Sequence, residues 1–422
     1  MRAGFAEVDI TPPLGTRKIG WLKELIGERV LDPLSARVAV FESGAERIGF
    51  VQLDTLSVRW TQTSEIRRLV EELHGFPGAH VMVAATHNHG GPAIANCGLV
   101  PRDEGYLRTL VAKVADAFGR ALAGAVEAQV GMGRVLEYGL SHNRRIVMRD
   151  GTVRTHGRAT DPDALCIEGP IDPEVAVLAA RAADGRPLGC IMNFACHPTA
   201  HGGGTAFTGG YPAMLARAMK LQGWPMTLFL NGACGNVHTH DPVSGVELDM
   251  AETGWRLAQD ALKAIEPMAF RREAALAARV KTVHLPYRHV SDDEVKGTVC
   301  GAQRFVDPAI YDQGMPALLE RIRQRGSQPA EVQALALDEW AFVSIPAEYF
   351  VEHGLRIKEQ SHPRRALVVS CANGMVGYVP TAAAFARGGY ETTFAASSRL
   401  APEAGDVLAD AAVDGVRGAG TP

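Results

Sequence analysis

The stretch from residue 81 to residue 92 reads VMVAATHNHGGP. Its first five residues are apolar and predict a short buried strand. Two histidines, His87 and His89, follow with a spacing of two, and Gly-Gly-Pro comes directly after them. In extended backbone, residues i and i+2 point to the same side, so both imidazoles are expected to face one point just beyond the strand. Imidazole is a zinc ligand and a general acid/base near neutral pH, so the pair indicates a metal or catalytic site; two solvated loop histidines are the alternative.

Apolar runs that end in polar residues recur along the chain. Strands are predicted at 48–54, 188–196, 226–230, 340–345 and 366–370, and helical periodicity is found at 63–74, 106–123, 211–221 and 349–360. This alternation predicts an α/β fold with a mixed, largely parallel sheet core flanked by helices. Residues 3–10 are predicted to form an edge strand.

Ligands of parallel sheets gather beyond the carboxyl ends of the strands. The residues at these ends supply imidazole, carboxylate, amide and phenol groups, and they predict a metal-centred hydrolytic site at one edge of the sheet. Other roles stay open: Asp54 as a helix cap or an orienting group, Tyr378 as core, and His201 and His240 as solvated side chains. The strand-end residues are Asp54, His87, His89, His197, His201, Asn236, His238, His240, Glu348 and Tyr378.

Composition and charge narrow the class of protein. The 422 residues are 46% hydrophobic and 21% charged, and a net charge of −4 without a basic stripe argues against a nucleic-acid partner. The N-terminus lacks the apolar core of a signal peptide, and no run is long and apolar enough to span a membrane, so we expect a cytoplasmic protein without a membrane anchor. Seven scattered cysteines without a CxxC motif predict free thiols. We expect a single domain, 1–422, with a possible subregion at 271–328.

Five blocks of the sequence resemble the catalytic domain of the neutral/alkaline ceramidases. Their order and spacing extend over almost the whole chain. They are residues 5–15 (FAEVDITPPLG), 86–89 (THNH), 193–199 (NFACHPT), 235–238 (GNVH), and Glu348 together with residues 377–381 (GYVPT).

The resemblance implies one Zn²⁺ ion held by His87, His197, Glu348 and Tyr378. It also implies that His89 is a general acid/base and that Arg144 binds the substrate or an oxyanion. The chain departs from the family at its G-D-V-S turn, where Asn236 replaces the aspartate and His238 replaces the serine. His238 is then expected to serve as a hydrogen-bond donor, as an acid or as a further metal ligand.

The leading hypothesis is zinc-dependent hydrolysis of an amide (N-acyl) bond in a small soluble substrate by a metal-activated water. His89 would move the proton, and Arg144 with the backbone amides of Gly235 and Asn236 would hold the oxyanion. Three alternatives stay open: a metal-dependent ester or lactone hydrolase or lyase, a cysteine hydrolase that uses Cys234, and a non-catalytic metal-binding protein.

Overall fold

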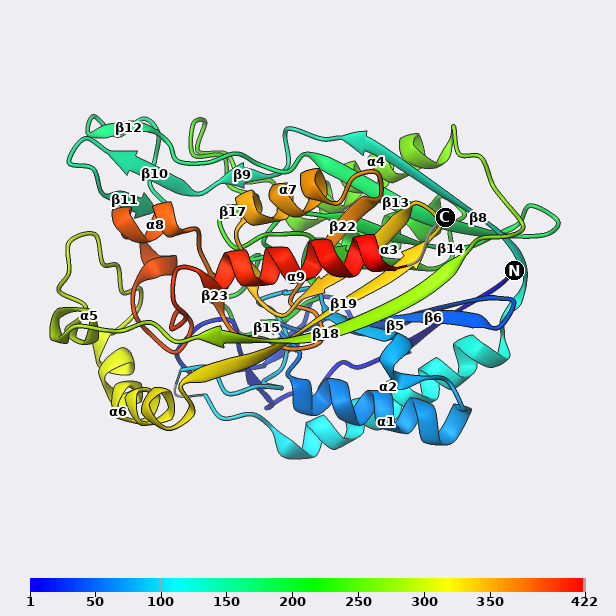
Figure 1. Cartoon of the computed structure of the whole chain (residues 1–422), viewed down its shortest axis with the longest axis horizontal. Helices are drawn as coiled ribbons and strands as arrows, with labels where there is room; N and C mark the ends of the chain where they lie inside the picture. The colour runs from blue at the N-terminus through cyan, green and yellow to red at the C-terminus, as the bar shows by residue number, and fades with distance from the viewer. Residues whose placement is uncertain (99, 420–422) are drawn as a thin grey trace.

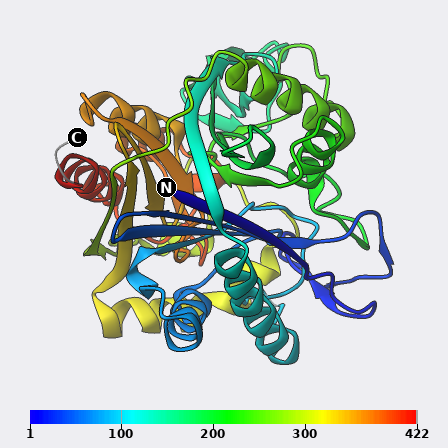
Figure 2. The ribbon, with the colours of Figure 1, turned by 90° about the vertical axis from the view of Figure 1, so that its right-hand side faces the viewer.

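The computed structural model describes residues 1–98 and 100–419. Two mixed β-sheets pack face to face, and helices cover their outer faces (Figures 1 and 2). The interface between the sheets is apolar and draws on strands of both. Phe50 of one sheet and Phe342 of the other meet edge to face, with ring centroids 5.0 Å apart. The predicted α/β class, with a mixed sheet flanked by helices, is confirmed.

The larger sheet has eight strands, most of which are buried on both faces. Along one of them, Ala36, Val38 and Val40 face helices while Ala39 and Phe41 face the other sheet, so its sequence is a continuous apolar run. The order is β16 (Thr227–Asn231), β14 (Pro187–Phe194), β13 (Glu174–Ala182), β8 (Val126–Leu136), β1 (Arg2–Asp9), β5 (Ser35–Ser43), β6 (Glu46–Leu53) and β7 (Val81–Ala85).

The smaller sheet has four strands in the order β18 (Leu276–Pro286), β19 (Ser327–Leu337), β20 (Trp340–Ile345) and β22 (Arg365–Ser370). Further short strands lie in the segments that connect the elements of the two sheets. They are β2 (Arg17–Lys18), β3 (Leu25–Ile26), β4 (Arg29–Val30), β9 (His142–Asn143), β10 (Arg145–Met148), β11 (Val153–Thr155), β12 (Ala164–Ile167), β15 (Ala206–Phe207), β17 (Val237–His238), β21 (Glu348–Tyr349) and β23 (Tyr378–Val379).

Three helix pairs cover the sheets. α1 (Trp60–His74) and α2 (Glu104–Ala123) pack on the β1–β5–β6–β7 half of the larger sheet, and α3 (Gly210–Leu221) and α4 (Met250–Ile265) pack on the other half. α7 (Val351–Gln360) and α9 (Ala404–Gly418) cover the smaller sheet. The remaining helical segments are η1 (Gly78–His80), α5 (Asp292–Lys296), α6 (Pro308–Arg325), α8 (Ala382–Arg387) and η2 (Tyr390–Thr392).

The prediction of a largely parallel sheet is wrong. Five of the seven strand pairs in the larger sheet are antiparallel, and β18–β19 and β19–β20 are antiparallel too. Parallel pairing is found at β6–β7, β14–β16 and β20–β22, where α1, α3 and α7 provide the crossovers. The turns at 44–45 and 183–186 instead join neighbouring strands as hairpins, which forces antiparallel pairing.

The prediction that residues 3–10 form an edge strand is also wrong. β1 pairs along its whole length with β5 and, at Arg2 and Ala3, with β8, so it joins the two halves of the larger sheet. β18 of the predicted subregion 271–328 is part of the smaller sheet. The single-domain reading of 1–422 stays a prediction, and residues 99 and 420–422 lie outside the described part. None of the described helices combines the length and the apolar character that a membrane span requires.

Candidate metal centre

The three parallel strand pairs of the two large sheets lead into the predicted site residues. β7 leads into His87 and His89, and β14 leads into His197. β20 and β22 lead into the short strands β21 and β23, which pair in parallel and place Glu348 opposite Tyr378. The rule that ligands gather at carboxyl ends therefore holds, because the parallel pairs are the ones that end at the site.

His87, His89 and His197 form a compact cluster. Nε2 of His197 lies 2.8 Å from Nε2 of His87 and 3.2 Å from Nε2 of His89. Nδ1 of each ring is directed at a main-chain carbonyl, an arrangement that leaves Nε2 available to a metal when the imidazole is neutral. The carbonyls are those of Leu56 (2.6 Å from His87), Gly20 (2.7 Å from His89) and Cys234 (3.1 Å from His197).

This cluster fits a metal ion. The three imidazoles face one another, and their ligand atoms all lie within 4.8 Å of one another. Two ligands at roughly 2.0–2.1 Å from a tetrahedral ion are about 3.3 Å apart, close to the spacings in the cluster. The carbonyl contacts at Nδ1 are also the usual way in which a metal-binding histidine is oriented. The His87, His89 and His197 group can therefore hold a metal.

Glu348 and Tyr378 border the cluster. The Glu348 carboxylate lies 3.3 Å from Nε2 of His87 and 3.8 Å from Nε2 of His197, and it hydrogen-bonds to Tyr378. Burial raises the pKa of Glu348, but His87, the hydrogen bond with Tyr378 and His89 together lower it, so that the net pKa is lowered. Burial likewise lowers the pKa of His87, but Glu348, with smaller effects of Cys234 and the Leu56 carbonyl, raises it, so that the net pKa is raised. This reciprocal effect gives the site a carboxylate among its possible ligands.

The other two imidazoles of the cluster are held neutral. Burial, with a smaller effect of His87, lowers the pKa of His89 to about 3. Burial also lowers the pKa of His197 far below its ordinary value. Neutral imidazole is the form that binds a metal or accepts a proton.

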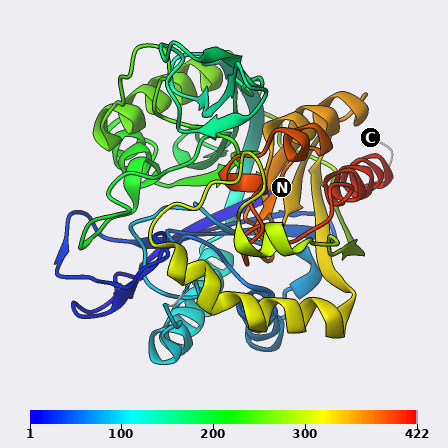
Figure 3. The same ribbon diagram turned by 90° about the vertical axis from the view of Figure 1, so that its left-hand side faces the viewer.

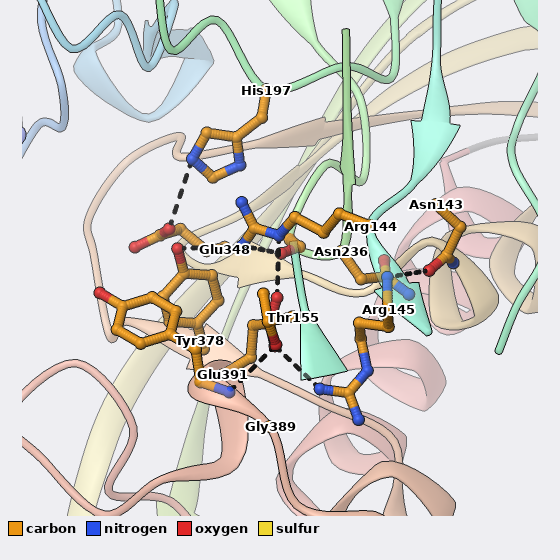
Figure 4. A network of polar contacts seen from close by, with 12 residues as sticks. Asn143, Arg144, Arg145, Thr155, His197, Asn236, Glu348, Tyr378, Gly389 and Glu391 are labelled. Atoms are coloured by element: carbon orange, nitrogen blue, oxygen red, sulfur yellow. Dashed lines mark hydrogen bonds and ion pairs between the residues drawn. The ribbon is translucent and has the colours of Figure 1, made fainter. Parts of the chain in front are cut away.

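Arg144 is held next to the cluster by a buried ion-pair network (Figure 4). Its Nε donates to Glu391 at 2.8 Å, and its Nη2 donates to the carbonyl oxygen of Gly235 at 2.7 Å and to Tyr378 Oη at 3.2 Å. Glu391 also accepts hydrogen bonds from Arg145 at 2.8 Å and from Thr155 at 2.7 Å. Figure 4 shows the Arg144 guanidinium between Glu391 and the Glu348–His197 pair, so a substrate held there would lie beside the candidate metal ligands.

The predicted oxyanion donor Gly235 requires a correction, whereas the role of the Asn236 N–H stays a prediction. The Gly235 N–H donates to the Tyr349 carbonyl at 2.8 Å, so it is not free to bind an oxyanion. The Asn236 side chain donates to Glu352 at 2.9 Å and accepts from the Val351 N–H at 2.9 Å. The turn at 235–236 therefore positions Arg144, which donates to the Gly235 carbonyl and whose N–H donates to the Asn236 carbonyl at 3.0 Å.

His238 lies with a second set of imidazoles. Its ring centroid is 4.9 Å from that of His156 and 5.7 Å from that of His240, and burial together with His156 and Arg144 lowers its pKa far below the ordinary value. The side chain is buried, and its Nε2 has no hydrogen-bond partner among the described residues. The structure places His238 beside Arg144 and outside the compact metal-type cluster, and its catalytic role stays a prediction.

The backbone at His87 differs from the extended geometry expected from the i, i+2 spacing. β7 ends at Ala85, and His87 has φ +66°, a left-handed conformation that a residue with a side chain rarely adopts. Its N–H donates to the Thr55 carbonyl at 3.0 Å, which helps to hold the conformation. The two rings still converge, because this local turn aims His87 at His197. Such strain is typical of functional positions.

The Cys234 thiol is not accessible from solvent. The side chain is fully buried beside Val237 and Val351, and its thiol hydrogen-bonds to Cys371, which lowers the pKa of Cys234. Asp54 is equally buried: it accepts hydrogen bonds from the Ser35 N–H at 2.9 Å and from the Gln52 side chain at 2.8 Å. Burial raises its pKa to about 6.

Sequence reasoning missed Glu391 and the hairpin at Gly20. Glu391 lies in η2, beyond a short helix and far from any strand end, so no strand-end pattern marks it. The carbonyl of Gly20 orients His89, and a side chain at this glycine would collide with His89. Backbone carbonyls leave no signal in a sequence, whereas the glycine itself, with φ +123°, is a visible one.

Together these observations define the chain as an α/β protein of two packed mixed sheets with an imidazole–carboxylate centre at the ends of its parallel strands. No family model matches the sequence. The curated neutral ceramidase of Pseudomonas aeruginosa is 29% identical over 174 residues, which are 39% of this chain and 25% of that protein. The chain thus matches a quarter of the relative's length.

Solved structures give the wider match. A crystal structure of neutral ceramidase from Pseudomonas aeruginosa has a TM-score of 0.76 at 18% identity, over 99% of this chain and 74% of that chain. A structure of ceramidase complexed with C2 gives the same values. The chain therefore has the neutral ceramidase fold, and the resemblance predicted from the sequence is confirmed.

Proposed function

We propose that this protein is a zinc-dependent hydrolase that cleaves an amide (N-acyl) bond of a small soluble substrate. The observation that carries the proposal is the convergence of His87, His197 and Glu348, with Nε2–Nε2 and Nε2–Oε2 spacings of 2.8, 3.3 and 3.8 Å. Zn²⁺ bound there would act as a Lewis acid on a carbonyl and bring the pKa of water into the neutral range. The similarity to neutral ceramidase supports amide chemistry.

Each residue of the site has a proposed task. His87, His197, Glu348 and Tyr378 would hold the ion. His89 Nε2, left available in the neutral imidazole by the contact of Nδ1 with Gly20, would accept a proton from water and return it to the leaving nitrogen.

Arg144 would bind the carbonyl oxygen of the substrate. Its guanidinium is fixed by Glu391 and by the Gly235 carbonyl, so the positive charge is preorganised.

A polar substrate is favoured over a lipid. The region beside Arg144 carries the imidazoles of His238, His156 and His240, and the buried His238 Nε2 has no hydrogen-bond partner among the described residues. A substrate with a polar group next to its scissile bond would supply that partner. An acyl chain would instead leave the imidazole unsatisfied.

The test combines metal analysis with a substrate panel. The purified protein is expected to hold one Zn²⁺ per chain, to lose turnover of N-acyl substrates on chelation and to regain it when Zn²⁺ is added. An exposed histidine on β18 provides the control, because His284→Ala should leave the metal content and the turnover unchanged.

Each contrary outcome selects another function. Turnover of esters or lactones but not of amides would change the proposed reaction and leave the proposed metal site unchanged. Tight binding of metal without turnover of any substrate would indicate a non-catalytic metal-binding protein. Amide turnover that survives complete metal removal would overturn the proposal.

A further inference from the structure

A second pocket, of about 610 Å³, lies at the end of β18 against α5, α8 and η2. Figure 3 views the molecule from this end, with α5 and α6 in yellow and α8 in orange-red. Arg288, Phe385 and Phe394 line the pocket. None of the candidate metal ligands lines it, so it is a separate site.

Arg288 supplies positive charge to this pocket. Its side chain is only 7% exposed, and the centres of the Phe385 and Phe394 rings lie 5.4 and 5.0 Å from its guanidinium carbon. Nη1 donates to the Thr392 carbonyl at 2.8 Å, whereas Nε and Nη2 have no hydrogen-bond partner among the described residues. Burial lowers the pKa of Arg288 to about 10, which leaves it charged at neutral pH. Two buried donors on one edge of a guanidinium are rare without an acceptor.

Glu294 is the nearest carboxylate, and it is held back. Its Oε1 lies 3.8 Å from Nε of Arg288, beyond hydrogen-bond distance. Its Oε2 accepts from the Ser291 N–H at 2.8 Å, as part of the capping box that begins α5. Because this cap fixes Glu294, the chain itself leaves the Nε–Nη2 edge without an acceptor.

We propose that this pocket binds the carboxylate group of a small organic acid. The Nε–Nη2 edge of arginine matches the two oxygens of a carboxylate, and an apolar body would lie against Phe385 and Phe394. Glu294 and Glu403 also line the pocket, so a monoanion is favoured over a dianion such as phosphate. The site requires neither the metal nor amide hydrolysis.

The test is isothermal titration of the full-length chain with hexanoate, acetate and inorganic phosphate. We expect hexanoate to bind more tightly than acetate, and phosphate not to compete. Arg288→Gln should weaken hexanoate binding about tenfold or more, since it removes a charged pair of donors. Glu294→Gln should strengthen it by roughly twofold to fivefold, because it removes the opposing charge. Arg323→Gln is the control: Arg323 is exposed and paired with Glu320, does not line the pocket, and should not change binding.

The proposal predicts opposite changes in hexanoate affinity for the two variants. It can therefore still be refuted if one variant does not fold. If Arg288→Gln does not fold, Glu294→Gln alone decides. Hexanoate affinity that neither variant changes would place the ligand elsewhere, for example at the metal centre. Absence of hexanoate binding to folded Glu294→Gln, or phosphate binding in preference to carboxylates, would overturn the assignment.

Discussion

Replacement of Glu391 by glutamine tests the network that positions Arg144. Glu391 is fully buried and accepts hydrogen bonds from Arg144, Arg145 and Thr155 at 2.7–2.8 Å. Glu391→Gln keeps the shape of the side chain but removes its charge. One guanidinium then faces the amide NH₂ group, and both arginines lose their shared buried carboxylate.

The size of the effect follows from the pKa of Glu391. Burial raises this pKa, but Arg144 and Arg145 outweigh burial and hold it at about 2. Relative to the ordinary value of about 4.3, this corresponds to about 3 kcal/mol of stability at neutral pH. Breaking a buried ion pair by removing one partner costs roughly 3–5 kcal/mol. Both routes therefore predict that Glu391→Gln lowers the free energy of unfolding by about 3 kcal/mol or more.

The pH dependence has a definite sign. Because the pKa of the folded protein is depressed, the stabilisation from Glu391 is complete above the unfolded pKa of about 4.3 and is lost as pH falls towards about 2. The difference between wild type and Glu391→Gln should be full at pH 7 and shrink between about pH 5 and pH 2.

Urea unfolding of metal-free protein at several pH values measures this difference without a contribution from metal binding. Glu42→Gln is the matched control, because Glu42 pairs with the half-exposed Arg2 and should lose less than about 1 kcal/mol. A loss below about 1 kcal/mol for Glu391→Gln, or a loss that is constant across the pH range, would refute the reasoning.

Three further predictions concern the metal centre. His87→Ala should lose bound metal. His89→Ala should retain metal and lose turnover by roughly 10²–10⁴-fold, which metal analysis together with kinetics will measure. Equal loss of metal in both variants would make His89 a ligand. Cys234→Ala should keep the turnover of wild type in a steady-state assay, because the thiol is buried, and an inactive but folded and metal-loaded variant would revive the cysteine hydrolase. His238→Ala should keep its metal and lower kcat/KM about tenfold through one lost hydrogen bond, so unchanged kinetics would remove His238 from the site.

Much of the site was predictable from local pattern. An apolar run that ends in a histidine or a glutamate marks a buried strand with a polar terminus, and this signal located His87, His197 and Glu348. It works because burial and strand termination are local properties of the chain. The hairpin turns at 44–45 and 183–186 are equally local signals, and turns this short are compatible only with antiparallel pairing of the strands that they join.

Other features depend on contacts between distant segments. Glu391 reaches Arg144 across 247 positions, and the Gly235 N–H is occupied by the carbonyl of Tyr349. No periodicity records such pairings, because each partner is an ordinary residue in its own segment. The same holds for the two unpaired donors of Arg288, which become unusual only when the Glu294 cap and the two phenyl rings surround them.

The stretch 81–92 shows where the division lies. Its sequence alone determined that a buried strand ends at two histidines, because hydrophobic burial and strand length depend on consecutive residues. The tertiary structure alone decided how the rings meet: the left-handed turn at His87, the carbonyls that orient each Nδ1, and the approach of His197 and Glu348 to the same point. Convergence of three strand ends requires two sheets to pack against each other, and that packing is a property of the whole chain.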